Sequence, residues 1–340
     1  MSPNKIINPL PMGLEMDGRF KIEKFRGDTC TYSSEADSSN LFLIGTLDFM
    51  MANSATSQLE PIGVIFGAGN STPLESQSSL QSRIGTSGAG TSVSATNTVY
   101  PSAPIPYVEH VQVWQSNEGA VVGNVAELGL VTGTLAAPTR LITRALVKDV
   151  SGNPTTVTVA SDEFIRVTYA KRYYGVMGAT GVLNIATPSG PLALDYEIRP
   201  VGMTGNYVWS NSVRDFPSGY LCLGSDTGNF VSYGGCGVTS EAAFRAVDGS
   251  SLATATSNRF EMKTAGTYVN GSKTRTDIIR LSLLNGNIAA PGIRSIIIGH
   301  GNANGSARNM VHQVLLSGPF QKLSSHIFDL PVTTTLGNAA

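Results

Sequence analysis

Two pairs of carboxylates have a spacing that could support catalysis. Asp195 and Glu197 stand two apart in an expected strand, and Asp162 and Glu163 are adjacent in an expected turn. Residues two apart on a strand share one face, and glycoside hydrolysis needs two carboxyl groups facing each other across a sugar. The first spacing is allowed but common by chance, and acidic residues are ordinary in turns. We assign no catalytic residue to either pair.

Histidine and cysteine show no metal-binding pattern. The histidines are His110, His300, His312 and His326, and the cysteines are Cys30, Cys222 and Cys236. No two histidines stand at i, i+4, and an H-E-x-x-H sequence is absent. An odd, sparse set of cysteines without a C-x-x-C pair argues against a disulfide framework and against a thiolate metal site. We assign no metal ligand.

A glycine loop follows an apolar run at residues 62–66 and invites comparison with cofactor-binding loops. Gly67-Ala68-Gly69 lacks the third glycine of a dinucleotide-binding loop, and Pro73 makes a poor helix entrance for a pyrophosphate. No Walker-type lysine follows a glycine loop, and no G-x-S-x-G sequence marks a hydrolase nucleophile. We therefore assign no cofactor and expect no enzymatic activity.

Several aromatic residues could line a sugar-binding face. They are Tyr173, Tyr174, Tyr207, Trp209 and Tyr220. Packing in the interior or in an interface is the favoured interpretation, because such rings dominate the energetics of both. A glycan-binding face remains open as the alternative.

The composition favours a protein that associates with other chains. Of the 340 residues, 41% are hydrophobic, enough for real cores, but only 14% are charged. A weakly charged surface gives up part of the repulsion that keeps monomers apart. The net charge of −1 provides no electrostatic footprint for nucleic acid. We expect no signal peptide and no membrane insertion, because the first eleven residues lack the pattern of a leader and the apolar runs are short.

The first 40 residues predict an extended N-terminal arm, with one short strand at residues 19–25. A frayed terminus is the alternative, whereas a docked arm is how one subunit reaches its neighbour. Residues 40–55 predict a helix capped by Asn40, residues 62–66 and 108–114 predict strands, and residues 82–103 predict a long loop.

The strongest β pattern lies at residues 139–174. Runs at 140–150, 155–160 and 164–174 are rich in β-branched residues with a period of two, and Ser151-Gly152-Asn153-Pro154 provides a turn between the first two. We interpret this region as an antiparallel hairpin or meander.

The second half predicts further short strands separated by turn residues, after a breaker-rich boundary at residues 175–191. The expected strands are 192–199, 207–213, 220–223, 230–233, 259–263, 277–284, 292–298 and 309–316, and one helix is expected at 240–247. The predicted fold is mainly β, with antiparallel β-sandwich-like domains, few short helices and the extended arm. The predicted domains are 1–40, 41–175 (a β-rich assembly module) and 176–340 (a second β-rich domain).

Four segments keep a fixed order between residues 62 and 174. They are 62–73 (IGVIFGAGNSTP, followed by LQSR at 80–83), 125–130 (VAELGL), 143–159 (TRALVKDVSGNPTTVTV) and 162–169 (DEFIRVTY). Their order resembles a module of virion structural proteins of tailed bacteriophages, of the tail, collar, baseplate-associated or fibre-attachment type. The resemblance covers about a third of the chain. It carries no catalytic residues.

The resemblance implies a structural component of the virion that is made in the host bacterial cytoplasm. Its partners would be copies of itself, as a homo-oligomer, and other virion structural proteins. The alternative is an adhesin of the same particle that binds a host-surface receptor or glycan through its C-terminal half. A third hypothesis, a polysaccharide-degrading enzyme, would depend on Asp195 or Glu197.

Overall fold

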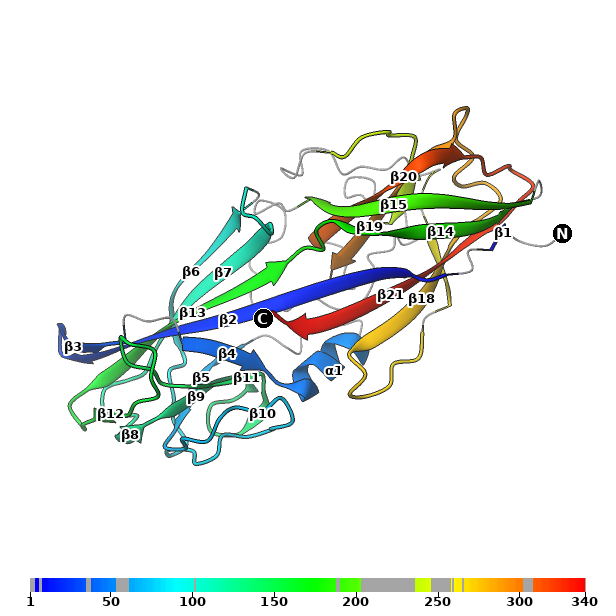
Figure 1. The fold of residues 1–340 in the computed structure, drawn as a ribbon. Helices are drawn as coiled ribbons and strands as arrows, with labels where there is room; N and C mark the ends of the chain where they lie inside the picture. The colour runs from blue at the N-terminus through cyan, green and yellow to red at the C-terminus, as the bar shows by residue number, and fades with distance from the viewer. Residues whose placement is uncertain are drawn as a thin grey trace.

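The protein is built almost wholly from β-strands, which confirms the predicted fold class (Figure 1). The computed structural model describes residues 4–5, 8–34, 38–52, 61–100, 102–187, 190–202, 236–245, 258, 260–264, 266–301 and 308–339. Within them lies a single α-helix, α1 (Ile44–Ala52), and no helix there is long and apolar enough to cross a membrane.

The strands of the first half are β1 Asn4–Lys5, β2 Leu10–Arg26, β3 Thr29–Ser33, β4 Ser38–Phe42, β5 Gly63–Gly67, β6 Thr91–Tyr100, β7 Tyr107–Gln115, β8 Gly123–Val125, β9 Glu127–Gly133, β10 Pro138–Leu141, β11 Thr143–Leu146, β12 Val157–Val159 and β13 Phe164–Tyr174. Those of the second half are β14 Ala179–Thr187, β15 Gly190–Gly202, β16 Gly237–Thr239, β17 Glu261–Thr264, β18 Thr274–Leu281, β19 Ile293–Gly301, β20 Arg308–Phe320 and β21 Phe328–Asn338. The main sheet runs β10-β9-β11-β4-β2-β13-β7-β6, with β21 and β18 joined to it beside β2. A separate sheet runs β14-β15-β20-β19-β16.

Strand β2 is the axis of the fold. Its residues alternate between buried and outward positions from Leu10 to Ile22, as expected for a strand with one face on a core. It pairs with β13 on one side and with β4 and β21 on the other. The prediction that this segment is an arm free to reach a neighbour is therefore wrong for residues 10–26, because the strand is paired within the chain along its whole length, residues 10–16 with β21, residues 15–25 with β13 and residues 23–26 with β3.

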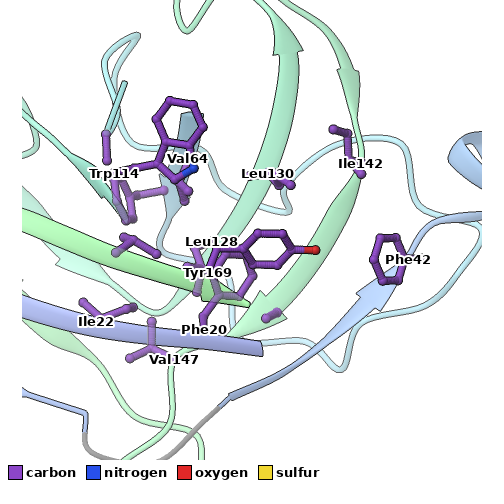
Figure 2. Close-up of a cluster of buried hydrophobic side chains, with 14 of the residues drawn as sticks. Phe20, Ile22, Phe42, Val64, Trp114, Leu128, Leu130, Ile142, Val147 and Tyr169 are labelled. Carbon is purple, nitrogen blue, oxygen red and sulfur yellow. The ribbon is translucent and has the colours of Figure 1, made fainter. Parts of the chain in front are cut away.

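Two hydrophobic cores lie along β2. In the first, β2, β13 and β7 face β4, β5, β9 and β11, and Figure 2 shows Phe20 and Tyr169 of one layer beside Leu128 of the other. In the second, the five-stranded sheet packs on β18, β21 and the start of β2. Both are sandwich-like, and β2 and β21 contribute side chains to each. The proposed domain boundary at residues 175–176 stays a prediction; apart from the side chains of β2 and β21, the buried residues of the first core end at Tyr173 and those of the second begin at Leu183.

Strand positions were predicted better than strand pairing. The run at 164–174 coincides with β13, but successive strands of the expected meander do not pair with one another: β11 pairs with β4 and β9, β12 with β8, and β13 with β2 and β7. The predicted meander of these strands is therefore wrong, but the turn at 151–154 does join two short antiparallel segments, with Lys148 opposite Pro154 and the Thr155 N–H donating to the Val147 carbonyl at 2.9 Å. Nonlocal partners complete these strands because the buried face of each must meet the core that β2 organises.

Three local predictions also need correction. The loop expected at 82–103 contains the ten-residue strand β6, which sequence period could not reveal because both its faces are exposed. Asn40 lies in β4 and does not cap α1, which begins at Ile44. Residues 240–245 are not helical. The strands expected at 207–213, 220–223 and 230–233 lie outside the described residues.

Candidate functional site

The carboxylates considered for catalysis take part in local contacts on separate elements. Asp195 and Glu197 share the outer face of β15, as their spacing predicted, and Arg199 Nε donates to Glu197 Oε1 at 2.5 Å. Asp162 and Glu163 lie in the turn before β13, and Glu163 contacts Lys24 Nζ at 3.1 Å. The Ala160 N–H, and then Lys24 and Arg26, lower the pKa of Glu163 although its burial opposes this. The ionised Glu163 side chain therefore stabilises the turn before β13.

His110, His312 and His326 lie on different elements, and His300 lies in β19, which pairs with the strand of His312. His110 is buried in β7, opposite Lys171 of β13, and burial and then the Lys171 charge lower its pKa to about 3. His312 is buried in β20, where its Nε2 accepts the Val176 N–H at 3.0 Å. His326 lies in an exposed turn beside Ser325. Among the described residues, no three His, Cys, Asp or Glu side chains are grouped as metal ligands.

A buried ion pair organises the glycine loop. Glu127 begins β9, and its side chain is fully buried. Its Oε1 accepts the N–H groups of Gly69 at 3.1 Å and Ser82 at 2.8 Å, and its Oε2 accepts the Gln81 N–H at 3.1 Å and Arg144 Nε at 2.6 Å. We call these five residues the clamp. Burial raises the pKa of Glu127, but the Ser82, Arg144 and Gln81 hydrogen bonds outweigh it, and the net shift is downward.

The clamp explains why glycines stand at 67 and 69. A Cβ on Gly67 would lie 2.4 Å from Glu127 Oε1, and a Cβ on Gly69 would lie 2.5 Å from the same atom. Backbone N–H groups gathered around an anion are the feature that phosphate-binding loops share. Here the anion is the chain's own carboxylate, so the loop that resembled a cofactor site is filled from within.

Arg144 holds a second part of the same loop. It lies diagonally from Glu127 across the β9–β11 ladder, because Leu146 is the residue directly opposite Glu127. Its Nη1 donates to Gln77 Oε1 at 2.9 Å and its Nη2 to Ser71 Oγ at 3.3 Å. The guanidinium thus joins β9 to Ser71 and Gln77 in the segment that follows β5. The signal in the sequence was a charged residue of each sign inside two apolar strands, VAELGL and TRAL, which required a partner for each charge.

The comparisons with known proteins come to one result. No family model, curated protein or solved structure matches this chain. The functional argument therefore depends on the features of the chain itself, of which the exposed edge of the main sheet is the most informative.

Strand β6 forms that edge. It is the last strand in the order, and among the described residues only β7 pairs with it. Residues 91–96 are all exposed, so both faces of this part of the strand meet solvent. Figure 1 shows β6 and β7 standing out at one end of the main sheet. The sequence of β6, TSVSATNTVY, contains no charged residue and no proline.

An aromatic row crosses the outer face of the same sheet. Tyr100 of β6 stacks on Tyr107 of β7 at 4.5 Å between ring centroids, and Tyr107 meets Tyr174 of β13 at 5.3 Å. Arg172 lies over the Tyr107 ring at 5.1 Å and its Nε donates to Glu109 at 2.6 Å. We call these five residues the tyrosine row.

The aromatic residues singled out from the sequence separate in the structure. Tyr173 is buried in the first core, whereas its neighbour Tyr174 belongs to the tyrosine row. Tyr207, Trp209 and Tyr220 lie outside the described residues. Sequence reasoning missed Tyr100 and Tyr107, because the contact between them depends on the register of β6 against β7.

Proposed function

We propose that this chain is a structural subunit of a tailed phage particle, which assembles through contacts with its own copies and with other virion proteins at the tail, collar or baseplate. The observation that carries the proposal is the exposed, uncharged edge strand β6. Natural monomers protect such edges with charges, prolines or a covering segment, because an open row of N–H and C=O groups recruits another strand. Within the described part of the chain, no charge, proline or covering segment protects β6 beyond the irregularity between Ser92 and Ser94, and such an edge is suited to assembly.

The segments that resemble the phage module support the virion part of the proposal. The glycine loop, the LQSR run, and the VAELGL and TRAL strands contribute Gly69, Gln81, Ser82, Glu127 and Arg144, and these five residues form the clamp. Segments that keep their order in the sequence and share one buried ion pair behave as a unit of structure.

A second candidate function is an adhesin of the same particle that binds a host-surface glycan. The tyrosine row favours it, because aromatic rings beside charged hydrogen-bonding groups are suited to binding a sugar. Tyr100 is 36% exposed and stands at the end of the row. The remaining hypothesis, a polysaccharide-degrading enzyme, has no comparable support from the contacts of Asp195 and Glu197.

Cross-linking mass spectrometry on purified particles tests the leading proposal. We expect the chain among the particle proteins, with cross-links from its lysines to a second copy or to a neighbouring virion protein. Absence of the chain from particles that retain infectivity would refute the proposal. Binding of the purified chain to host cells, lost in Tyr100→Ala and kept in Tyr32→Ala, would favour the adhesin; clearing of a polysaccharide layer, lost in Asp195→Asn, would favour the enzyme.

A further inference from the structure

The open edge of β6 differs from the other long uncharged edge of the protein. Strand β14 ends the five-stranded sheet, but Leu183 and Ile185 of β14 are buried in the second core and β1 lies beside this strand. Strand β10 is short and contains Pro138 and Arg140, two residue types that discourage pairing. Only β6 combines length, absence of charge and exposure of both faces among the described residues.

We propose that β6 pairs antiparallel with β6 of a second copy, so that the main sheet continues across two subunits; this rests on the proposed assembly function and names its interface. The occupant follows from the chemistry of the strand. A strand that meets its own copy juxtaposes like residues, and here none carries a charge that would repel its twin. A partner chosen by charge would find nothing to recognise on β6.

Exposed apolar side chains lie along the same edge. Val93 is 51% exposed near the start of β6, Tyr100 is 36% exposed at its end, and Ile105 is 48% exposed in the turn that leads to β7. In an antiparallel pair the start of one strand meets the end of the other, so Val93 of each copy approaches the Tyr100 end of its partner. Burial of this area adds a hydrophobic contribution to the backbone hydrogen bonds.

Symmetry fixes which residues meet. Two antiparallel copies are related by a two-fold axis perpendicular to the sheet, which keeps each side chain on its own face. Residues that lie opposite each other must share a face of the sheet. The axis therefore passes between one residue and the same residue of the second copy. An irregularity between Ser92 and Ser94 interrupts the alternation, so the regular part of the strand is Ser94–Tyr100, and a pairing within that part places the axis at or next to Thr96, with Ala95 close to it.

The test places charges at the axis in the full-length chain. In Ala95→Lys or Thr96→Lys, the two copies of the new lysine would face each other near the axis, with their Cβ atoms about 5 Å apart and their ammonium groups close together. We expect one or both variants to raise the dissociation constant of the dimer about tenfold or more in sedimentation velocity, because like charges at this distance repel strongly at a partly buried site. Thr335→Lys on β21 is the matched control, since Thr335 is paired on both edges of its strand.

Mixing opposite charges distinguishes self-pairing from other contacts. A 1:1 mixture of Ala95→Lys with Ala95→Glu, or of Thr96→Lys with Thr96→Glu, is expected to restore a mixed dimer near the wild-type affinity. Circular dichroism spectra identical to wild type would show that the variants fold. A monomeric wild-type chain at high concentration would overturn the β6 pairing, as would a charge-disrupted assembly that the mixture does not rescue.

The outcome for β6 is separable from the proposed function. A wild-type oligomer unaffected by both lysine variants, but weakened by Thr180→Lys on β14, would overturn the β6 pairing and leave assembly intact. Detection of the chain in purified particles decides the proposed function independently of either result.

Discussion

Removal of the arginine from the clamp is the sharpest test of how the glycine loop is held. In Arg144→Met, the methionine keeps most of the apolar volume, but Glu127 loses its shortest hydrogen bond, the 2.6 Å contact from Arg144 Nε. Loss of one partner of a buried ion pair costs about 3–5 kcal/mol of folding free energy. Three N–H groups still solvate the carboxylate in the variant. We therefore expect a loss at the lower end, about 3 kcal/mol.

A double-mutant cycle separates the ion pair from general damage. Glu127→Gln alone leaves Arg144 buried without a counter-charge, whereas Glu127→Gln with Arg144→Met leaves no buried charge. The double variant is expected to be more stable than the sum of the single effects by about 1.5 kcal/mol or more in urea unfolding. The exposed pair of Glu197 and Arg199, 2.5 Å apart, is the matched control. The same substitutions there are expected to change stability by less than about 1 kcal/mol.

Hydrogen exchange localises the effect. The amides of Gly69, Gln81 and Ser82 donate to Glu127, so they are expected to exchange faster in Arg144→Met, while those of β13 stay protected. Additive effects in the cycle, within about 0.5 kcal/mol, together with unchanged exchange of these three amides, would refute the proposed clamp.

Three further predictions concern pH, packing and the junction of α1 with the second half. Because the pKa of His110 is lowered to about 3, the unfolded chain binds a proton between about pH 6.5 and 3 that the folded chain excludes. The free energy of unfolding is therefore expected to fall by up to about 1.4 kcal/mol for each pH unit of acidification in this range. His110→Gln should flatten this slope in urea unfolding. Gly69→Ala should lower the thermal midpoint, since its Cβ would lie 2.5 Å from the clamp carboxylate, whereas Gly337→Ala, with open space, should not. Burial, and then the hydrogen bond to Asp48, raise the pKa of Tyr268, so Asp48→Asn should lower that pKa in a spectrophotometric titration; an unchanged value would contradict the contact.

The sequence could predict strands whose two faces differ, because burial of one face imposes a period of two. The alternation of Phe164–Tyr174 identified β13 to the residue. Strand β5 is buried at every position and was located differently, to within a residue, by the continuous apolar run after Pro61. Residues 91–96, 98 and 100 of strand β6 are all exposed, so they carry no period of burial and the segment looked like a loop. The long central strand β2 was recognised only at residues 19–25, because Pro11 and the charges at its outward positions obscured the alternation of its buried ones.

Pairing could not be predicted because it depends on contacts far apart in the sequence. Turn residues at 151–154 do join two short antiparallel segments through the Lys148–Pro154 bridge, yet the strands beyond this turn pair elsewhere, β12 with β8 and β13 with β2. The clamp could not be predicted for the same reason, because its residues are also far apart in the sequence. Glu127 and Arg144 each looked unfavourable in an apolar strand, and only the β9–β11 register shows that each satisfies the other.

The ion pairs in the structure lower the charge of the surface below what the low charge of the sequence already indicates. Charged side chains are already few, and some of them are removed from the surface: the clamp pair is fully buried, and Arg275 contacts Asp277 at 2.8 Å with both side chains almost fully buried. Others neutralise each other on the outer face of the main sheet, where Arg172 contacts Glu109 at 2.6 Å. The charge that remains to repel a neighbouring copy is therefore lower than composition suggests. At β6 it is zero along ten residues, so the strongest natural barrier to edge-to-edge pairing is absent where the main sheet ends.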